Sequence, residues 1–164
     1  MKKPDYLIIV STETGEGKEV TKADIIELHT NSRAHGGQGF NRPGFDYLVQ
    51  TDGKLETILQ EENPNEVDLW GISEGMKGIM GTAKFLAYAG GMTEKATKEK
   101  DTRTDLQKDT LATVVKFYVR RFPEIQVLGW DQIPGKEGSK NPAFDVPKWL
   151  QEIGVPSDCI YQVH

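Results

Sequence analysis

The chain has 164 residues, of which 37% are hydrophobic and 27% are charged. This length and apolar content predict one domain, residues 1–164, with a buried core of its own. The formal net charge of -5 excludes the broad basic surface that binding to nucleic acid or an anionic membrane requires. The single cysteine, Cys159, excludes an internal disulfide, so packing and hydrogen bonds must hold the fold together.

The start of the chain gives no export or membrane signal. Two lysines precede an apolar run at residues 6–10, and that run is too short for a signal peptide or a membrane span. We therefore expect no signal peptide, no contact with membranes, and a location in the cytoplasm or in a virion.

The first elements are a strand and a helix. The continuous apolar run at residues 6–10 is typical of a strand buried inside a sheet. Thr21 and Asp24 have the spacing of a capping box, and apolar residues then recur at helical spacing to about residue 31.

A hairpin follows a glycine-rich loop at residues 35–44. Asp52-Gly53 is a strong turn signal, so residues 45–50 and 55–60 should pair as antiparallel strands. Residues 61–81 contain Pro and Gly breaks with mixed polarity, which indicates a long irregular crossing segment.

The second half of the chain predicts a strand and a long helix. Residues 83–89 form a strand that ends at Gly90-Gly91. Thr104 and Gln107 then make a capping box, and an apolar stripe marks a helix that runs to Phe122.

A last strand and helix complete the domain. Residues 126–130 predict a short strand, residues 134–142 a loop, and Asp145 caps a final helix that carries Trp149 and Leu150. The order strand, helix, hairpin, strand, helix, strand, helix predicts an α/β domain with a mixed central sheet flanked by helices.

Residues 11–18 directly follow a strand and resemble a phosphate-binding loop, because backbone amides at such turns attract anions. The spacing does not match a P-loop: no glycine stands five residues before Gly17, and Glu19 stands where Ser or Thr is required. A flavin-binding loop is a second alternative, but it belongs to an all-parallel sheet, which the Asp52-Gly53 hairpin disfavours. We interpret the segment as a polar surface loop.

The other candidate reactive residues favour structural or solvated roles. His29 falls on the apolar stripe of the first helix and is interpreted as a packing histidine, whereas His35 and His164 should be solvated. Cys159 has no histidine near it in sequence and is interpreted as a passive thiol. The pair Glu61-Glu62 borders turn residues and is typical of a solvated edge, with a general acid/base pair as the alternative.

Six segments form an ordered pattern along the chain: residues 7–10, 25–29, 44–53, 90–91, 101–104 and 141–146. This pattern resembles the zinc N-acetylmuramoyl-L-alanine amidases, which are related to phage amidase-type lysozymes and peptidoglycan recognition proteins. The resemblance covers about residues 6–153. It implies a mixed sheet flanked by helices, with a zinc cleft that cleaves the bond between the sugar lactyl group and the stem peptide.

The resemblance also implies three zinc ligands, and this chain departs from the family at each of them. Ser11 and Trp130 stand where the family has histidines, and Asn141 stands before a proline where the family has Cys or His. An indole cannot bind zinc, and neither a neutral hydroxyl nor a lone amide carbonyl is a suitable ligand. We therefore expect no metal and no other cofactor.

Two supporting positions change in the same direction. Phe45 replaces the family tyrosine that assists the oxyanion, so the ring stays but the hydroxyl is lost. Ser139 replaces a lysine, although Lys140 is adjacent. The large ring of Trp130 should also fill part of the cleft.

These departures predict a catalytically inactive protein with an amidase-like fold. We expect a structural or interaction component of phage or prophage origin, with a protein partner or self-assembly as its mode of action. One alternative is a non-catalytic muropeptide-binding protein, whose groove would contain Ser11, Phe45, Trp70, Trp130 and Asn141. A second alternative is an active amidase that degrades peptidoglycan.

Overall fold

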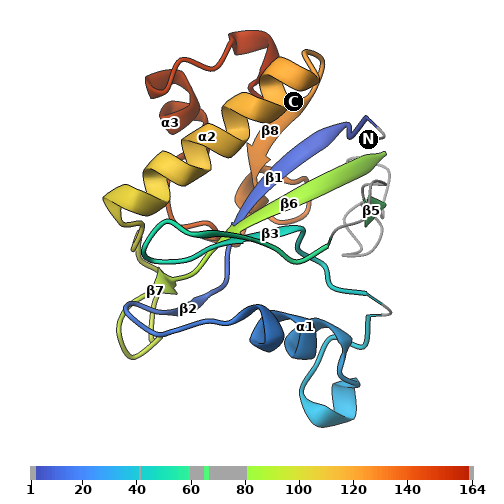
Figure 1. Cartoon of the computed structure of the whole chain (residues 1–164), viewed down its shortest axis with the longest axis vertical. Helices are drawn as coiled ribbons and strands as arrows, with labels where there is room; N and C mark the ends of the chain where they lie inside the picture. Colours follow the sequence, from blue (N-terminus) through green and yellow to red (C-terminus); the bar gives the residue numbers. More distant parts are fainter. Residues whose placement is uncertain (1–2, 41, 60–64, 67–80, 163–164) are drawn as a thin grey trace.

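The computed structural model describes residues 3–40, 42–59, 65–66 and 81–162 (Figure 1). Its main sheet contains β1 (Tyr6–Ser11), β3 (Tyr47–Val49), β4 (Leu55–Thr57), β5 (Asn65–Glu66), β6 (Thr82–Tyr88) and β8 (Gln126–Gly129). The helices are α1 (Lys22–Thr30), α2 (Asp105–Arg121) and α3 (Val146–Glu152), with short 3-10 turns between the elements. Within these described ranges, no helix is long and apolar enough to cross a membrane.

The sheet is mixed, as predicted, with the strand order β4-β3-β6-β1-β8. Strands β3, β6, β1 and β8 are parallel, whereas β4 is antiparallel to β3 and β5 is antiparallel to β6. The first strand is an interior strand: Ile8 on β1 lies opposite Phe85 on β6 and Leu128 on β8.

Helices cover both faces of the sheet because β1 is apolar on both sides. Leu7 and Ile9 pack with the buried residues of α2 and α3, and Ile8 and Val10 pack with Ile25 of α1. Figure 1 shows α2 and α3 on one side of the sheet and α1 on the other. Full burial of each such side chain contributes about 1.5–3 kcal/mol, so the apolar run fixes the position of β1.

The predicted capping box of the first helix is confirmed. The Thr21 hydroxyl accepts from the backbone N–H of Asp24 at 3.0 Å, and the Asp24 carboxylate accepts from the backbone N–H of Thr21 at 2.9 Å. The helix ends at Thr30, and Ile25 and His29 are its buried residues. These hydrogen bonds satisfy backbone donors that a helix otherwise leaves unpaired at its start.

The cap of the long helix is confirmed too, and it also attaches α2 to the sheet. Gln107 is completely buried, and its side-chain oxygen accepts from the backbone N–H of Thr104 at 2.9 Å. Its side-chain nitrogen donates to the carbonyls of Val49 at 3.2 Å and Ala89 at 2.9 Å, just beyond β6.

The predicted hairpin is confirmed, with shorter strands than expected. Gly53 has φ +84, and a Cβ there would lie 2.9 Å from the Leu106 carbonyl, so the turn requires glycine. Only Tyr47–Val49 and Leu55–Thr57 are strands, although the hairpin ladder continues by one bond: the Asp46 carbonyl accepts from the backbone N–H of Ile58. The backbone N–H of Asp46 donates to the Phe85 carbonyl. Of the predicted irregular segment 61–81, the described residues are β5 and Gly81.

Two expectations, one about a loop and one about the end of a strand, were wrong. Residues 11–18 are not only a surface loop: they contain β2 (Thr14–Gly15), which pairs in parallel with β7 (Gly91–Met92). Backbone pairing of two residues leaves no hydrophobic period in the sequence, so the pattern could not reveal it. The last strand ends at Gly129 rather than at residue 130, since Trp130 begins a 3-10 turn.

Candidate functional site

A cleft of about 320 Å³ lies where β1 ends, between α1 and the loop before α3. It is lined by Val10, Ser11, Thr12, Glu13, Leu28, His29, Gln38, Phe45, Trp130 and Asn141. Four of the five residues predicted for a groove, Ser11, Phe45, Trp130 and Asn141, therefore meet around one cavity. The fifth, Trp70, lies outside the described residues.

Asn141 joins the loop before α3 to the end of β1. Its side-chain oxygen accepts from the backbone N–H of Ser11 at 2.7 Å, and its side-chain nitrogen donates to the Ser11 carbonyl at 3.3 Å. The same nitrogen donates to the Glu13 carboxylate at 2.8 Å. Because Asn141 is only 7% exposed, these bonds replace solvent and hold its amide in one orientation.

Ser11, Trp130 and Asn141, the residues that the resemblance aligns with zinc ligands, do not offer the donor set that zinc requires. The Ser11 hydroxyl accepts from the backbone N–H of Glu13 at 3.2 Å and is packed so closely that a Cβ at Gly91 would lie 2.3 Å away. Trp130 contributes an indole ring, with the Lys136 ammonium 5.6 Å from its centre. Zinc sites use thiolate, imidazole or carboxylate donors, so these residues do not fit the metal.

His29 is buried, as predicted for a packing histidine, but it also lines the cleft. Its Nδ1 accepts from the backbone N–H of Gly44 at 2.8 Å, and its ring meets Phe45 edge-on at 4.6 Å. Burial lowers the pKa of His29 to about 4, so the ring is neutral at physiological pH. Since Nδ1 is an acceptor, the neutral ring carries its proton on Nε2. The apolar stripe of the helix predicted that His29 faces the core, but no sequence pattern indicated that it also lines a cleft.

Next to Phe45 lies an ion pair that the sequence analysis missed. Asp46 and Lys84 are 0% and 2% exposed, and the carboxylate and ammonium are 3.3 Å apart. The second carboxylate oxygen accepts from the backbone N–H of Phe85 at 2.7 Å. Burial raises the pKa of Asp46, and the charge of Lys84 opposes that rise. The sequence did contain a signal for this pair: Asp46 and Lys84 are charged residues inside two predicted apolar strands, residues 45–50 and 83–89.

Ser139 does not reach the cleft. It lines a neighbouring pocket of about 530 Å³ together with Lys140 and Asp131, and its hydroxyl accepts from the backbone N–H of Asn141 at 3.1 Å. Burial, followed by the nearby charge of Asp145, raises the pKa of Asp131 to about 6.

The remaining candidate residues stand apart from the cleft. His35 is exposed and shares a hydrogen bond with Ser32, while Cys159 is buried with its thiol bonded to the Pro123 carbonyl. Burial raises the pKa of Cys159, which disfavours the thiolate. His164 and the pair at residues 61–62 lie outside the described residues. Across the part of the chain that the structure describes, no three His, Cys, Asp or Glu residues form a group that could hold a metal ion.

The fold is that of N-acetylmuramoyl-L-alanine amidases and peptidoglycan recognition proteins. The amidase LysC from Clostridium intestinale URNW superposes with a TM-score of 0.65 at 16% identity, covering 94% of this chain and 87% of that one. Peptidoglycan recognition protein-LE, solved in complex with tracheal cytotoxin, gives 0.61 at 15% identity over 99% and 85% of the two chains.

The Ph2119 endolysin from Thermus scotoductus MAT2119 bacteriophage Ph2119 gives a TM-score of 0.58 at 16% identity, covering 94% of this chain and 87% of that one. No protein-family model matches the sequence, and no curated protein is similar to it at the sequence level. The predicted resemblance in fold is therefore confirmed, while activity and ligands have to be argued from the residues of the cleft.

Proposed function

We propose that the protein is a non-catalytic amidase-fold protein, a single domain that acts as a structural or interaction component. One observation carries this proposal: the Asn141 amide, which the resemblance aligns with a zinc ligand, directs its hydrogen bonds to Ser11 and Glu13. The amide is thus engaged by the Ser11 backbone and the Glu13 carboxylate, which disfavours a role as a metal ligand.

The chemistry of amide hydrolysis supports the same reading. A zinc amidase needs three protein ligands and an open position where the metal activates water and polarises the carbonyl. Ser11, Trp130 and Asn141 offer a hydroxyl, an indole and a carboxamide. Phe45 has no hydroxyl that could donate to a developing oxyanion, and neutral His29 lies edge-on against it.

Metal content and hydrolysis test the proposal together. The purified protein would be incubated with zinc, dialysed and analysed for bound metal, and would then be mixed with bacterial cell walls. We expect no stoichiometric zinc and no release of peptides from the walls. Near-stoichiometric zinc together with chelator-sensitive digestion would contradict the proposal and favour the active amidase.

A muropeptide-binding protein is the second candidate. It is favoured by the remaining cleft, whose lining combines the aromatic rings of Phe45 and Trp130 with the polar side chains of Gln38 and Glu13. The fold neighbour solved with tracheal cytotoxin holds a monomeric diaminopimelic acid-type peptidoglycan. Titration with soluble stem-peptide fragments tests this candidate: it requires a saturable signal that Trp130→Ala weakens.

We further propose a cytoplasmic or virion-associated location, a phage or prophage origin, and action through a protein partner or self-assembly. Support comes from the net charge of -5, which disfavours nucleic acid and anionic membranes as partners, and from the phage endolysin among the fold neighbours.

A further inference from the structure

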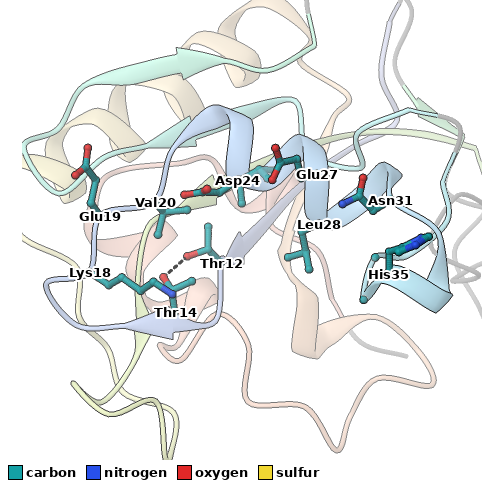
Figure 2. A pocket seen from close by; sticks show the side chains of 13 residues that line it. Thr12, Thr14, Lys18, Glu19, Val20, Asp24, Glu27, Leu28, Asn31 and His35 are labelled. Carbon is teal, nitrogen blue, oxygen red and sulfur yellow. Dashed lines mark hydrogen bonds between the residues drawn. The ribbon is translucent and has the colours of Figure 1, made fainter.

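A second pocket lies beside the cleft, along α1. It has a volume of about 430 Å³ and is lined by Thr12, Thr14, Lys18, Glu19, Val20, Asp24, Ile25, Glu27, Leu28, Asn31, His35, Gly36 and Gly37. Thr12 and Leu28 line both cavities, so the two are neighbours, and we call them together the joined groove. Figure 2 shows Asp24, Glu27, Leu28 and Asn31 along one side of the second pocket and Thr14 with Lys18 along the other.

Part of the lining of the joined groove is apolar and buried. Val20 and Ile25 are buried at 3% and 2% exposure, and the hydroxyls of Thr12 and Thr14 are bonded to each other at 2.7 Å. Leu28, by contrast, is 45% exposed. A branched apolar side chain from a ligand would cover Leu28 and gain about 25 cal/mol for each Å² of apolar surface removed from water.

The walls of the joined groove are acidic. Glu13 lines the cleft, Glu19, Asp24 and Glu27 line the second pocket, and Lys18 is the one lysine or arginine among the lining residues that the structure describes. The Asp24 carboxylate stays ionised because hydrogen bonds from Thr21 lower its pKa.

Glu13 is the most strictly oriented of these carboxylates. It has φ +55, a backbone conformation that costs a residue with a side chain about 1–2 kcal/mol. Asn141 donates to its carboxylate at 2.8 Å, and its backbone N–H bonds to the Ser11 hydroxyl. Asn141 therefore holds the negatively charged Glu13 carboxylate in a fixed position at the groove.

We propose that the joined groove binds an extended segment of a partner protein that alternates lysine or arginine with branched apolar side chains. The apolar side chains would cover Leu28, and the cationic ones would face Glu13, Glu19 and Glu27. Charge complementarity favours this occupant over an anionic one, since like charges across an interface lower both affinity and association rate. The proposal rests on the proposed function, because it takes the cleft as a binding surface rather than a catalytic one.

The test uses the full chain and three short peptides blocked at both ends. The first alternates lysine and leucine, the second replaces every lysine with glutamate, and the third replaces every leucine with serine. We expect saturable calorimetric binding of the first peptide, none of the second, and binding about tenfold weaker for the third. Backbone amide shifts should change at Thr12 and Leu28, and added salt should weaken binding.

Matched variants separate the groove from the overall negative charge. Glu19→Gln with Glu27→Gln should weaken binding of the first peptide by about fivefold or more. Asp109→Asn with Glu152→Gln removes the same charge from exposed residues of α2 and α3, and should change binding by less than about twofold.

Leu28→Ser tests the apolar contact in the same way. Its control is Leu106→Ser, at a leucine of α2 that is 56% exposed. Only the Leu28 variant should weaken binding of the lysine–leucine peptide.

Three results would overturn the proposal: no binding of the lysine–leucine peptide, equal weakening by both charge variants, or amide shifts confined to other faces. Each of these would leave the proposed function standing if the protein also binds no zinc and releases nothing from cell walls. Stoichiometric zinc with hydrolysis would overturn the proposed function whatever the peptides do, so the two failures are distinguishable.

Discussion

The two ends of β1 are held by different kinds of interaction. At Leu7, Ile8 and Ile9 the side chains are fully buried, and strands β6 and β8 pair with the backbone on both sides. At Ser11 the pairing with β8 has ended, and the Asn141 amide takes up the backbone N–H and carbonyl that β8 would otherwise bond. Strand β6 pairs with β1 along its whole length, so the ends differ on the other side, where β8 bonds the first end and one side chain, Asn141, bonds the second.

This difference shows which part of the fold depends on a particular residue. Apolar burial is non-directional, so many sequences of suitable volume can form the first end of β1. The hydrogen bonds of Asn141 need one side chain with both a donor and an acceptor at fixed positions.

The largest effect is expected in the apolar end. Ile9→Ala removes a completely buried side chain from the cluster shared with α2, and should lower the free energy of unfolding by about 2–5 kcal/mol. Urea denaturation followed by circular dichroism measures this loss. The conservative variant Ile9→Val should cost about 0.5–1.5 kcal/mol. Equal losses for the two variants would mean that volume does not govern this end of the strand.

Asn141→Ala should have the next largest effect. It leaves the buried backbone groups of Ser11 without their side-chain partner, which costs about 1–3 kcal/mol. Asn141→Asp should be at least as damaging at neutral pH, because a carboxylate cannot donate to Ser11 or Glu13 and repels the latter. Asn31→Ala, at an exposed residue, is the control and should change stability by less than about 0.5 kcal/mol. If Asn141→Ala left the free energy of unfolding unchanged, the proposed difference between the two ends of β1 would be wrong.

The sequence specified the apolar end of β1 far better than the polar one. The run at residues 6–10, the capping boxes at Thr21 and Thr104 and the turn at Gly53 all predicted the observed elements, because each is a local pattern with one physical cause. Ser11 and Asn141, which the resemblance to amidases places at one site, both line the cleft.

What could not be predicted depends on contacts between distant residues. Asn141 and Ser11 are 130 positions apart, and no local pattern indicates that the amide spans the Ser11 backbone. The same holds for Asp46 and Lys84, which are 38 positions apart and pair only because β3 and β6 are neighbours. The second pocket was missed because residues 11–18 were interpreted as a loop, which hid the β2 wall that carries Thr14.

A smaller, pH-dependent effect is expected from His29, beside the polar end of β1. Burial lowers the pKa of His29 from 6.5 to about 4, so the unfolded chain takes up a proton at a higher pH than the folded chain. Stability from this group is complete above pH 6.5 and is lost as the pH falls toward 4. His29→Gln should flatten the decrease in unfolding free energy over that window in urea titrations. An unchanged slope would mean that His29 titrates alike in both states.

The smallest effect is expected at the Ser11 side chain. Ser11→Ala removes a single hydroxyl, which accepts at 3.2 Å from the backbone N–H of exposed Glu13, so water can replace it at a cost of about 0.5–1 kcal/mol. Ser11→Val should cost more than Ser11→Ala, because the Ser11 side chain is packed against Gly91 and leaves no room for two methyl groups. Urea denaturation of both variants beside Asn141→Ala decides the point. If Ser11→Ala costs as much as Asn141→Ala, the hydroxyl contributes to this end of β1 as much as the amide does.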